Sequence, residues 1–201
     1  MILGISASGR KNMITDLAVK EILDSTELDY NFISLSDKKI GGCIGCLRCI
    51  KDNRCHVGDD WPWIAEEMIK AKVIVFGAPN YYGNINAMGH ACLERTFCFR
   101  HQSTFPLAGK LGIIVNTGYS NEDHSVSKYI YRLMTSNQIA IIGSLFVQGY
   151  SQCYSCAVGN NCEVGNVVRE HGFLEKITSK HLPPHFYDQK KSVDEARRLG
   201  K

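Results

Sequence analysis

The stretch Lys72-Val-Ile-Val-Phe-Gly77 holds a continuous apolar run bounded by a lysine and a glycine. Such a run is typical of a parallel strand covered on both faces, because neither face of that strand meets water. Four further strands are predicted on either side of it, at residues 2–6, 29–35, 111–116 and 139–147. Helices are predicted between and after them, at 13–23, 59–71, from the end of a 78–84 loop to about 98, at 125–137 and at 166–179. Strands that alternate with helices through short connections predict an α/β fold, a doubly wound five-stranded parallel sheet with helices on both faces.

Composition fits one ordinary globular domain of 201 residues, with 44% hydrophobic and 21% charged residues. The net charge of +3 is too small to indicate a nucleic-acid partner. We expect no membrane association and a cytoplasmic location, because no apolar run is long enough to span a bilayer and the first residues read as a strand. We predict a single domain over 1–180, and the Pro183-Pro184 pair with the charged end indicates a tail over 181–201.

Three unusual loops follow predicted strands, at 6–15, 78–84 and 117–122. In an open parallel sheet, ligands bind at the carboxyl ends of the strands, beside the point where the strand order reverses. We therefore expect these three loops to converge on one pocket.

The first of these loops, Ser6-Ala-Ser-Gly-Arg-Lys-Asn-Met-Ile-Thr15, leads from a strand into a helix. It offers hydroxyls, a guanidinium and backbone amides at a helix N-terminus, which are the groups that hold a terminal phosphate. Neither a P-loop nor a dinucleotide fingerprint fits its spacing. The alternative interpretation is a polar turn that only caps the helix.

This loop resembles the phosphate loop of the NAD(P)H-dependent FMN reductase family of flavodoxin-like proteins. It keeps Ser8, Arg10 and Thr15 at matching places and departs from the family pattern at Ala7, Gly9 and Met13. The stretch Gly77-Ala-Pro-Asn-Tyr-Tyr-Gly-Asn84 is similar to the family's second loop, which lies against the flavin ring. The resemblance covers about residues 2–150.

That resemblance implies an FMN site built from the three loops. The residues it implies are Ser6, Ser8, Arg10, Asn12 and Thr15 at the phosphate, Pro79, Asn80, Tyr81, Tyr82, Gly83 and Asn84 at the ring, and Thr117, Gly118 and Tyr119, by position only, in the third loop. No side chain is predicted to act as a nucleophile or general base, since a flavin carries the redox chemistry itself.

Nine cysteines are many for a chain that shows no export signal, and seven of them fall into two groups. Cys43, Cys46, Cys49 and Cys55 form a C-x2-C-x2-C-x5-C run within a loop at 41–58. Four thiolates this close can hold one [4Fe–4S] cluster. Zinc is the main rival, although zinc cysteines usually come as two separated pairs. Free thiols and a disulfide are further alternatives.

The cysteine run resembles the compact motif of iron–sulfur flavoproteins, a branch of the same reductase family. The resemblance implies electron transfer between the cluster and FMN, with a ferredoxin-like carrier or NAD(P)H as the donor. Members of the family are oligomers, so it also implies a homodimer or homotetramer in which a neighbour's cluster serves each flavin.

The second group, Cys153, Cys156 and Cys162, lies in a loop at 150–165 and repeats the C-x2-C-x5-C end of the first run. It lacks a fourth ligand, which Cys92, Cys98, His90, His171 or a partner subunit would have to supply. A structural loop without redox activity, or a disulfide formed on oxidation, explains the same pattern.

Two other functions stay open on the sequence alone. One is an NAD(P)H-dependent FMN or quinone reductase without a cluster, whose cysteines carry zinc or nothing. The other is a non-enzymatic module that senses metal or redox state on the same scaffold.

Overall fold

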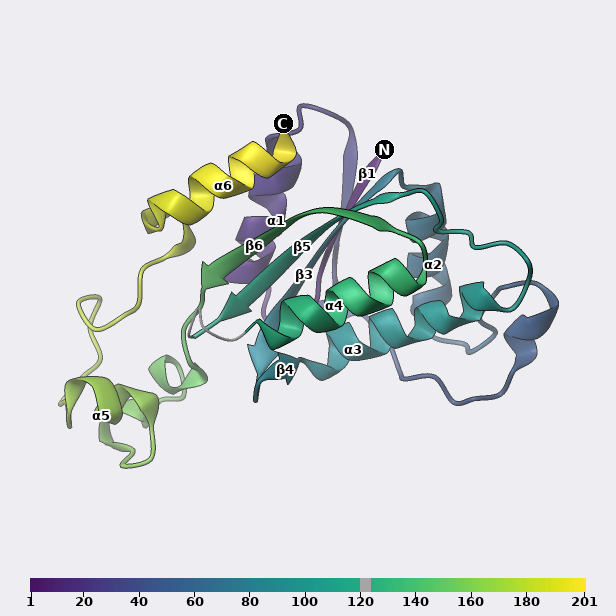
Figure 1. Ribbon diagram of the computed structural model, residues 1–201. Helices are drawn as coiled ribbons and strands as arrows, with labels where there is room; N and C mark the ends of the chain where they lie inside the picture. Colours follow the sequence, from purple (N-terminus) through teal and green to yellow (C-terminus); the bar gives the residue numbers. More distant parts are fainter. Residues whose placement is uncertain (120–123) are drawn as a thin grey trace.

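The computed structural model describes residues 1–119 and 124–201. Within these residues, five strands form a parallel sheet in the order β2-β1-β3-β5-β6, and a short strand pairs antiparallel with the end of β3 (Figure 1). The strands are β1 (Ile2–Ser6), β2 (Tyr30–Ser34), β3 (Val73–Tyr81), β4 (Asn84–Ile85), β5 (Leu111–Gly118) and β6 (Ala140–Gln148). The predicted five-stranded parallel sheet is confirmed, and its order is that of flavodoxin-like proteins.

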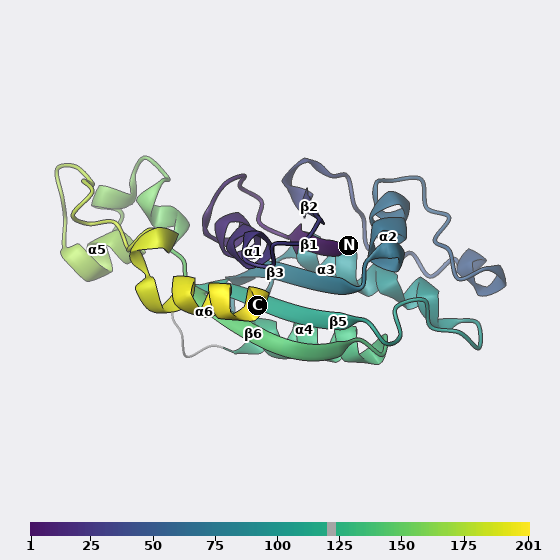
Figure 2. The same ribbon diagram turned by 90° about the horizontal axis from the view of Figure 1, so that it is seen from above.

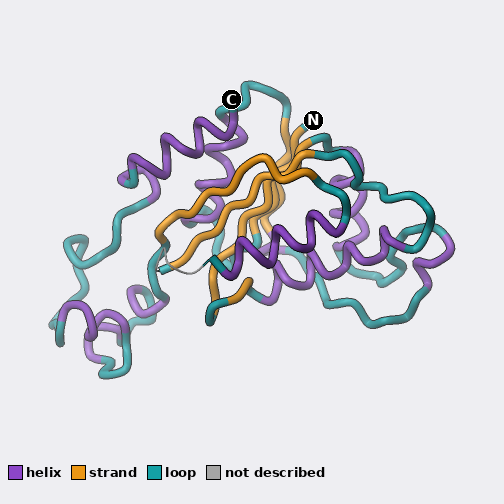
Figure 3. The backbone as a smooth tube through the Cα atoms, viewed as in Figure 1, coloured by secondary structure: helices purple, strands orange, loops and turns teal. Residues whose placement is uncertain are grey.

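Helices cover both faces of this sheet, as Figures 2 and 3 show. The helix α1 (Ile14–Asp24) packs with α6 (Lys190–Gly200) in one core cluster. The other cluster holds residues of α2 (Trp61–Lys70), α3 (Ala87–Glu94) and α4 (Ser125–Ser136). A further helix, α5 (Asn166–His171), stands apart from the sheet. Short 3-10 helices lie at Leu35–Asp37, Arg48–Lys51, Arg95–Arg100, Gln152–Tyr154, Gly159–Asn161 and Phe186–Asp188.

The alternation of side chains along each strand divides the core into these two clusters. In β3, Ile74 and Phe76 belong to the cluster under α2, while Val75, between them, belongs to the cluster under α1. Gly77 lets α1 approach β3 closely, because a Cβ there would lie 2.5 Å from a methyl carbon of Val19. The buried first turn of α1 therefore meets the sheet directly beside the strand ends.

Several elements differ from the sequence-based expectations. The strand β5 continues to Gly118, so that Thr117 and Gly118 of the expected 117–122 loop are strand, and α3 ends at Glu94, where a 3-10 helix follows. The strand β3 continues to Tyr81, so that part of the expected 78–84 loop is strand. The helix expected at 166–179 ends at His171, because Gly172 follows in the left-handed region with φ of 74°. The expected tail contains α6, which buries Val193 and Ala196 against the α1 side of the core.

A search for membrane-spanning helices found no candidate in the described part of the chain.

Candidate functional site

The three loops that were expected to converge do line one cleft at the carboxyl ends of β1, β3 and β5. Its volume is about 390 Å³. The predicted residues that line it are Ser8, Arg10, Thr15, Pro79, Asn80, Tyr81, Tyr82, Thr117, Gly118 and Tyr119. Ser6, Asn12, Gly83 and Asn84 are not among its lining residues. Residues 120–122 of the predicted third loop lie outside the described residues.

Hydrogen bonds within the first loop explain this division. The Ser6 hydroxyl donates to Asp16 at 2.5 Å, and the backbone amide of Asn12 donates to the same buried carboxylate at 2.8 Å. Ser6 and Asn12 therefore hold the loop in shape from behind. Ser8 lies on the cleft side, where its hydroxyl accepts from the Arg10 amide at 3.1 Å and donates to the Arg10 carbonyl at 2.8 Å. These bonds fold the loop into a turn that presents Arg10 at the cleft.

The second loop is a tight hairpin between β3 and β4. Tyr82 and Gly83 both have left-handed backbone, with φ of 55° and 73°, and the Gly83 amide donates to the Asn80 side chain at 2.9 Å. This turn leaves the Tyr82 side chain fully exposed at the edge of the cleft. The flanking Tyr81 hydroxyl accepts from Gln152 at 3.1 Å, which ties the hairpin to the segment after β6.

The third loop supplies polar groups from β5. The hydroxyls of Thr15 and Thr117 lie 2.7 Å apart and join the start of α1 to the end of β5. The buried hydroxyl of Tyr119 has no hydrogen-bond partner within the described residues, and Tyr119 lines the cleft. A buried donor without a partner is costly, so this hydroxyl fits a cleft that takes a polar ligand.

Sequence reasoning missed one wall of the cleft, which Gly149, Tyr150, Ser151, Gln152 and Asn166 supply. The signal was present, because residues 149–152 follow the carboxyl end of β6 and the strand-end rule applies to them as well. Their place in the second cysteine loop obscured it.

The second candidate site is the cysteine loop over residues 41–58. Its four predicted ligands, Cys43, Cys46, Cys49 and Cys55, all line one small cavity, together with Cys98. Burial and the charges of the other three cysteines raise the pKa of Cys49. The pKa of Cys98 is also raised, first by burial and then by the charges of Cys55 and Cys49. The geometric evidence that these thiols are neighbours is that all of them line the same small cavity.

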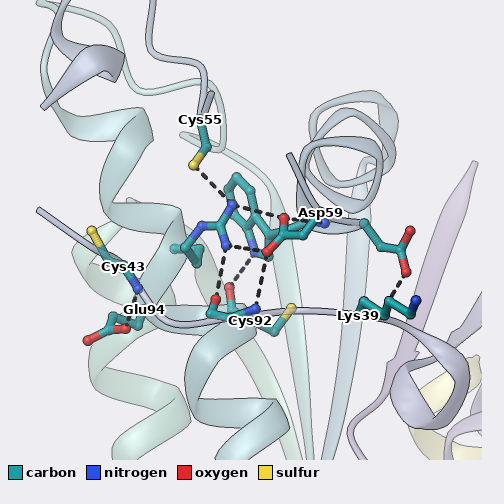
Figure 4. Close-up of polar contacts among 10 residues, drawn as sticks. Lys39, Cys43, Cys55, Asp59, Cys92 and Glu94 are labelled. Carbon is teal, nitrogen blue, oxygen red and sulfur yellow. Dashed lines mark hydrogen bonds and ion pairs between the residues drawn. The ribbon is translucent and has the colours of Figure 1, made fainter. Parts of the chain in front are cut away.

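Arg95, which the sequence analysis did not identify, holds this loop in place through hydrogen bonds to Cys55 and Asp59, two residues labelled in Figure 4. Its side chain is only 1% exposed, and it donates to the Cys55 sulfur at 3.0 Å and to the Gly41 carbonyl at 2.9 Å. Both of its terminal nitrogens also bond Asp59, at 2.8 and 3.1 Å, and its guanidinium lies 5.1 Å from the centre of the Trp61 ring. Burial alone raises the pKa of Asp59, but the bonds from Arg95 and from two backbone amides outweigh it, and the pKa is lowered.

The helix α3 joins the two sites. Before its first residue, the Asn86 side chain donates to the Ala7 carbonyl of the first cleft loop at 2.6 Å. At its other end, Glu94 accepts from the Cys43 backbone amide at 2.8 Å, and Arg95 follows directly. The cleft and the cysteine loop are therefore attached to opposite ends of one helix.

Hydrophobic burial accounts for little of the cysteine loop. Asn53 is the one buried residue between positions 41 and 58, and Ile44, Leu47 and Ile50 are exposed. Within residues 1–119 and 124–201, no three His, Cys, Asp or Glu side chains are arranged around a single metal ion. The four thiols line one common cavity from separate positions along the loop.

Solved structures share this architecture. The Trp repressor binding protein of Bacillus subtilis is 12% identical with a TM-score of 0.65, and the alignment covers 100% of this chain and 98% of that one. An azoreductase of Bacillus anthracis is 12% identical with a TM-score of 0.61, covering 99% and 97%. An archaeal flavodoxin is 14% identical with a TM-score of 0.51, covering 100% and 94%. The protein is thus a flavodoxin-like α/β protein with a ligand cleft at its strand ends.

The family is more specific. The model of the NADPH-dependent FMN reductase family matches residues 1–149, so the chain belongs to that family and is an FMN-dependent oxidoreductase. It falls in the iron–sulfur flavoprotein branch. One iron–sulfur flavoprotein of Methanocaldococcus jannaschii is 30% identical over 147 residues, 71% of this chain and 75% of that protein. Another, of Archaeoglobus fulgidus, is 28% identical over 146 residues, 70% of this chain and 64% of that protein.

Proposed function

We propose that this oxidoreductase passes electrons between FMN in the strand-end cleft and a [4Fe–4S] cluster on Cys43, Cys46, Cys49 and Cys55. The observation that carries the proposal is the pairing of the four thiols around one cavity with the cationic Arg95 beneath them. Four thiolates and a cluster make a site of net negative charge, and a buried guanidinium beside one ligand sulfur offsets part of that charge.

The residues of the cleft have distinct roles in this proposal. Arg10, Ser8 and Thr15 lie where they would hold the phosphate at the start of α1, and the 79–82 hairpin would lie against the flavin ring. Ser6 and Asn12 would not touch the phosphate themselves; they fix the shape of the loop through their hydrogen bonds to Asp16. Bound FMN supplies a centre that exchanges one or two electrons, so the chain itself need only bind, orient and shield it.

The donor we propose is a ferredoxin-like carrier or NAD(P)H. The cleft and the cysteine loop lie at opposite ends of α3, so we also propose a homodimer or homotetramer in which one subunit's cluster serves another subunit's flavin. Sedimentation tests this arrangement: a monomer with rapid electron transfer from cluster to flavin would contradict it.

Anaerobic purification followed by iron, sulfide, zinc and FMN quantification on one sample tests the central proposal. We expect one FMN per chain, and about four iron atoms per chain that are lost when Cys43, Cys46, Cys49 and Cys55 are all changed to Ser. Zinc without iron would reject the cluster. One FMN, no iron and rapid NAD(P)H oxidation would instead favour the cluster-free reductase.

A further inference from the structure

We infer that Cys153, Cys156 and Cys162 form a second iron–sulfur binding site, held by three thiolates and placed against the wall of the strand-end cleft. This site lies beyond the family match, which ends at residue 149. It goes beyond the proposed function and does not depend on a cluster at Cys43–Cys55.

The first argument is the identical spacing of two cysteine groups. Cys153, Cys156 and Cys162 follow C-x2-C-x5-C, which is also the spacing of Cys46, Cys49 and Cys55. Both groups are built on short 3-10 helices, and both contain a non-glycine residue with left-handed backbone, Leu47 in one and Ala157 in the other. The chain therefore presents three thiols twice in the same sequential arrangement.

The second argument is that all three cysteines contact the same short stretches of backbone, although no three His, Cys, Asp or Glu side chains of the described residues surround one metal position in this structure. The Asn166 amide donates to the Cys153 sulfur at 3.4 Å, and a Cβ on the preceding Gly165 would lie 3.3 Å from the Cys162 sulfur. The Cys156 thiol donates to the Cys153 carbonyl at 3.5 Å. All three side chains thus lie around the backbone of residues 153 and 165–166. His171 is directed elsewhere, with its Nε2 3.2 Å from the Tyr154 hydroxyl, so the segment offers three ligands.

The third argument is the lack of a hydrophobic core in this segment. Between positions 151 and 182, Tyr154 and Val167 are the buried residues apart from two glycines. Apolar residues such as Val158, Val164 and Phe173 are exposed. A small unit with so little buried apolar surface normally relies on a metal or a disulfide for its fold. Bound metal would supply that stabilisation, as it does in small metal-binding domains.

The location gives the site its significance. Figures 1 and 2 show the α5 segment and the 41–58 loop at opposite ends of the molecule. Ser151 and Gln152, which precede Cys153, line the cleft, and so does Asn166, whose amide bonds the Cys153 sulfur. A cluster on these thiols would lie directly behind the cleft wall of the same subunit, where the 41–58 loop does not reach.

The test is metal quantification on four proteins reconstituted anaerobically with ferrous iron and sulfide. They are the wild type, the triple variant C153S/C156S/C162S, the single variant C156S and, as a control outside both groups, C92A. The exposed Cys156 thiol makes C156S a mild change, in case the triple variant fails to fold. We expect the triple variant to hold about four fewer iron atoms per chain than the wild type and C92A, which is about four against eight when the Cys43–Cys55 site is also filled. C156S should also contain less iron and less sulfide per chain than the wild type.

Two results would overturn the inference. One is equal iron and sulfide in the wild type, the triple variant and C156S. The other is about one zinc per chain, without extra iron, that disappears with the three cysteines. A fifth protein, C43S/C46S/C49S/C55S, separates the two sites, because failure of the cluster at Cys43–Cys55 would show as unchanged iron in this variant alone. FMN per chain, measured on each sample, reports on the cleft independently.

Discussion

Replacing Asp59, which directly follows the cysteine loop, with Asn should destabilise the protein. Asp59 is the carboxylate that compensates Arg95, whose side chain is 1% exposed. Removing one partner of a buried ion pair leaves the other charged and desolvated, at a cost of about 3–5 kcal/mol. The neighbouring Asp60 gives a matched control, since its side chain accepts from the Lys39 backbone amide at 2.7 Å and an Asn side chain can still accept there.

Urea unfolding measures the difference, with flavin and iron removed from every sample so that the transition reports on the polypeptide alone. We expect Asp59→Asn to lower the free energy of unfolding by about 3–5 kcal/mol and Asp60→Asn by less than about 1 kcal/mol. Equal losses in the two variants would refute the reasoning, because the Asp59–Arg95 pair would then contribute no more than an exposed hydrogen bond.

The other predictions concern acid stability, packing and flavin affinity. The pKa of Asp59 is lowered in the folded chain, so below the ordinary carboxyl pKa of about 4 the unfolded chain binds more protons than the folded chain. The free energy of unfolding therefore decreases as the pH is lowered through this range. Acid titration should show this loss in the wild type and a smaller loss in Asp59→Asn. Gly77→Ala should cost about 1–3 kcal/mol in urea unfolding, because its Cβ meets α1 at 2.5 Å, whereas Gly58→Ala, with nothing within 4 Å, should cost little. Arg10→Ala should weaken FMN binding by roughly tenfold to a hundredfold in a fluorescence titration, while Lys11→Ala, which lies off the cleft on Asp37, should not.

The sheet was predictable from the sequence because its signals are local. The apolar run at 73–76 and the strand at residues 2–6 each carry their own evidence, and the structure places β1 at Ile2–Ser6 as predicted. Helix α6 was missed because charged residues dominate residues 190–201. Its apolar positions, Val193, Ala196 and Leu199, are spaced by three, and that stripe is the signal for a packed helix.

The parts of the candidate site that depend on where a loop follows a strand were predictable. The parts that depend on contacts between residues far apart in the sequence were not. The strand-end rule indicated that the three loops meet, and they do. Arg95 could not have been identified in the same way, because its partners Cys55, Asp59 and Gly41 lie 36 to 54 residues away along the chain. No local pattern distinguishes an arginine that will be buried from one that will be solvated.

The helix α3 also fixes the distance between the cleft and the cysteine loop. Its eight residues span about 12 Å, and Ala91, Cys92 and Leu93 in its second half are buried. Asn86 hydrogen-bonds to the first cleft loop at one end, and Glu94 and Arg95 hydrogen-bond to the cysteine loop at the other. The length of the helix therefore sets the distance between these two attachment points. Inserting or deleting four residues would change that spacing by about 6 Å and rotate one attachment point by about 40° relative to the other.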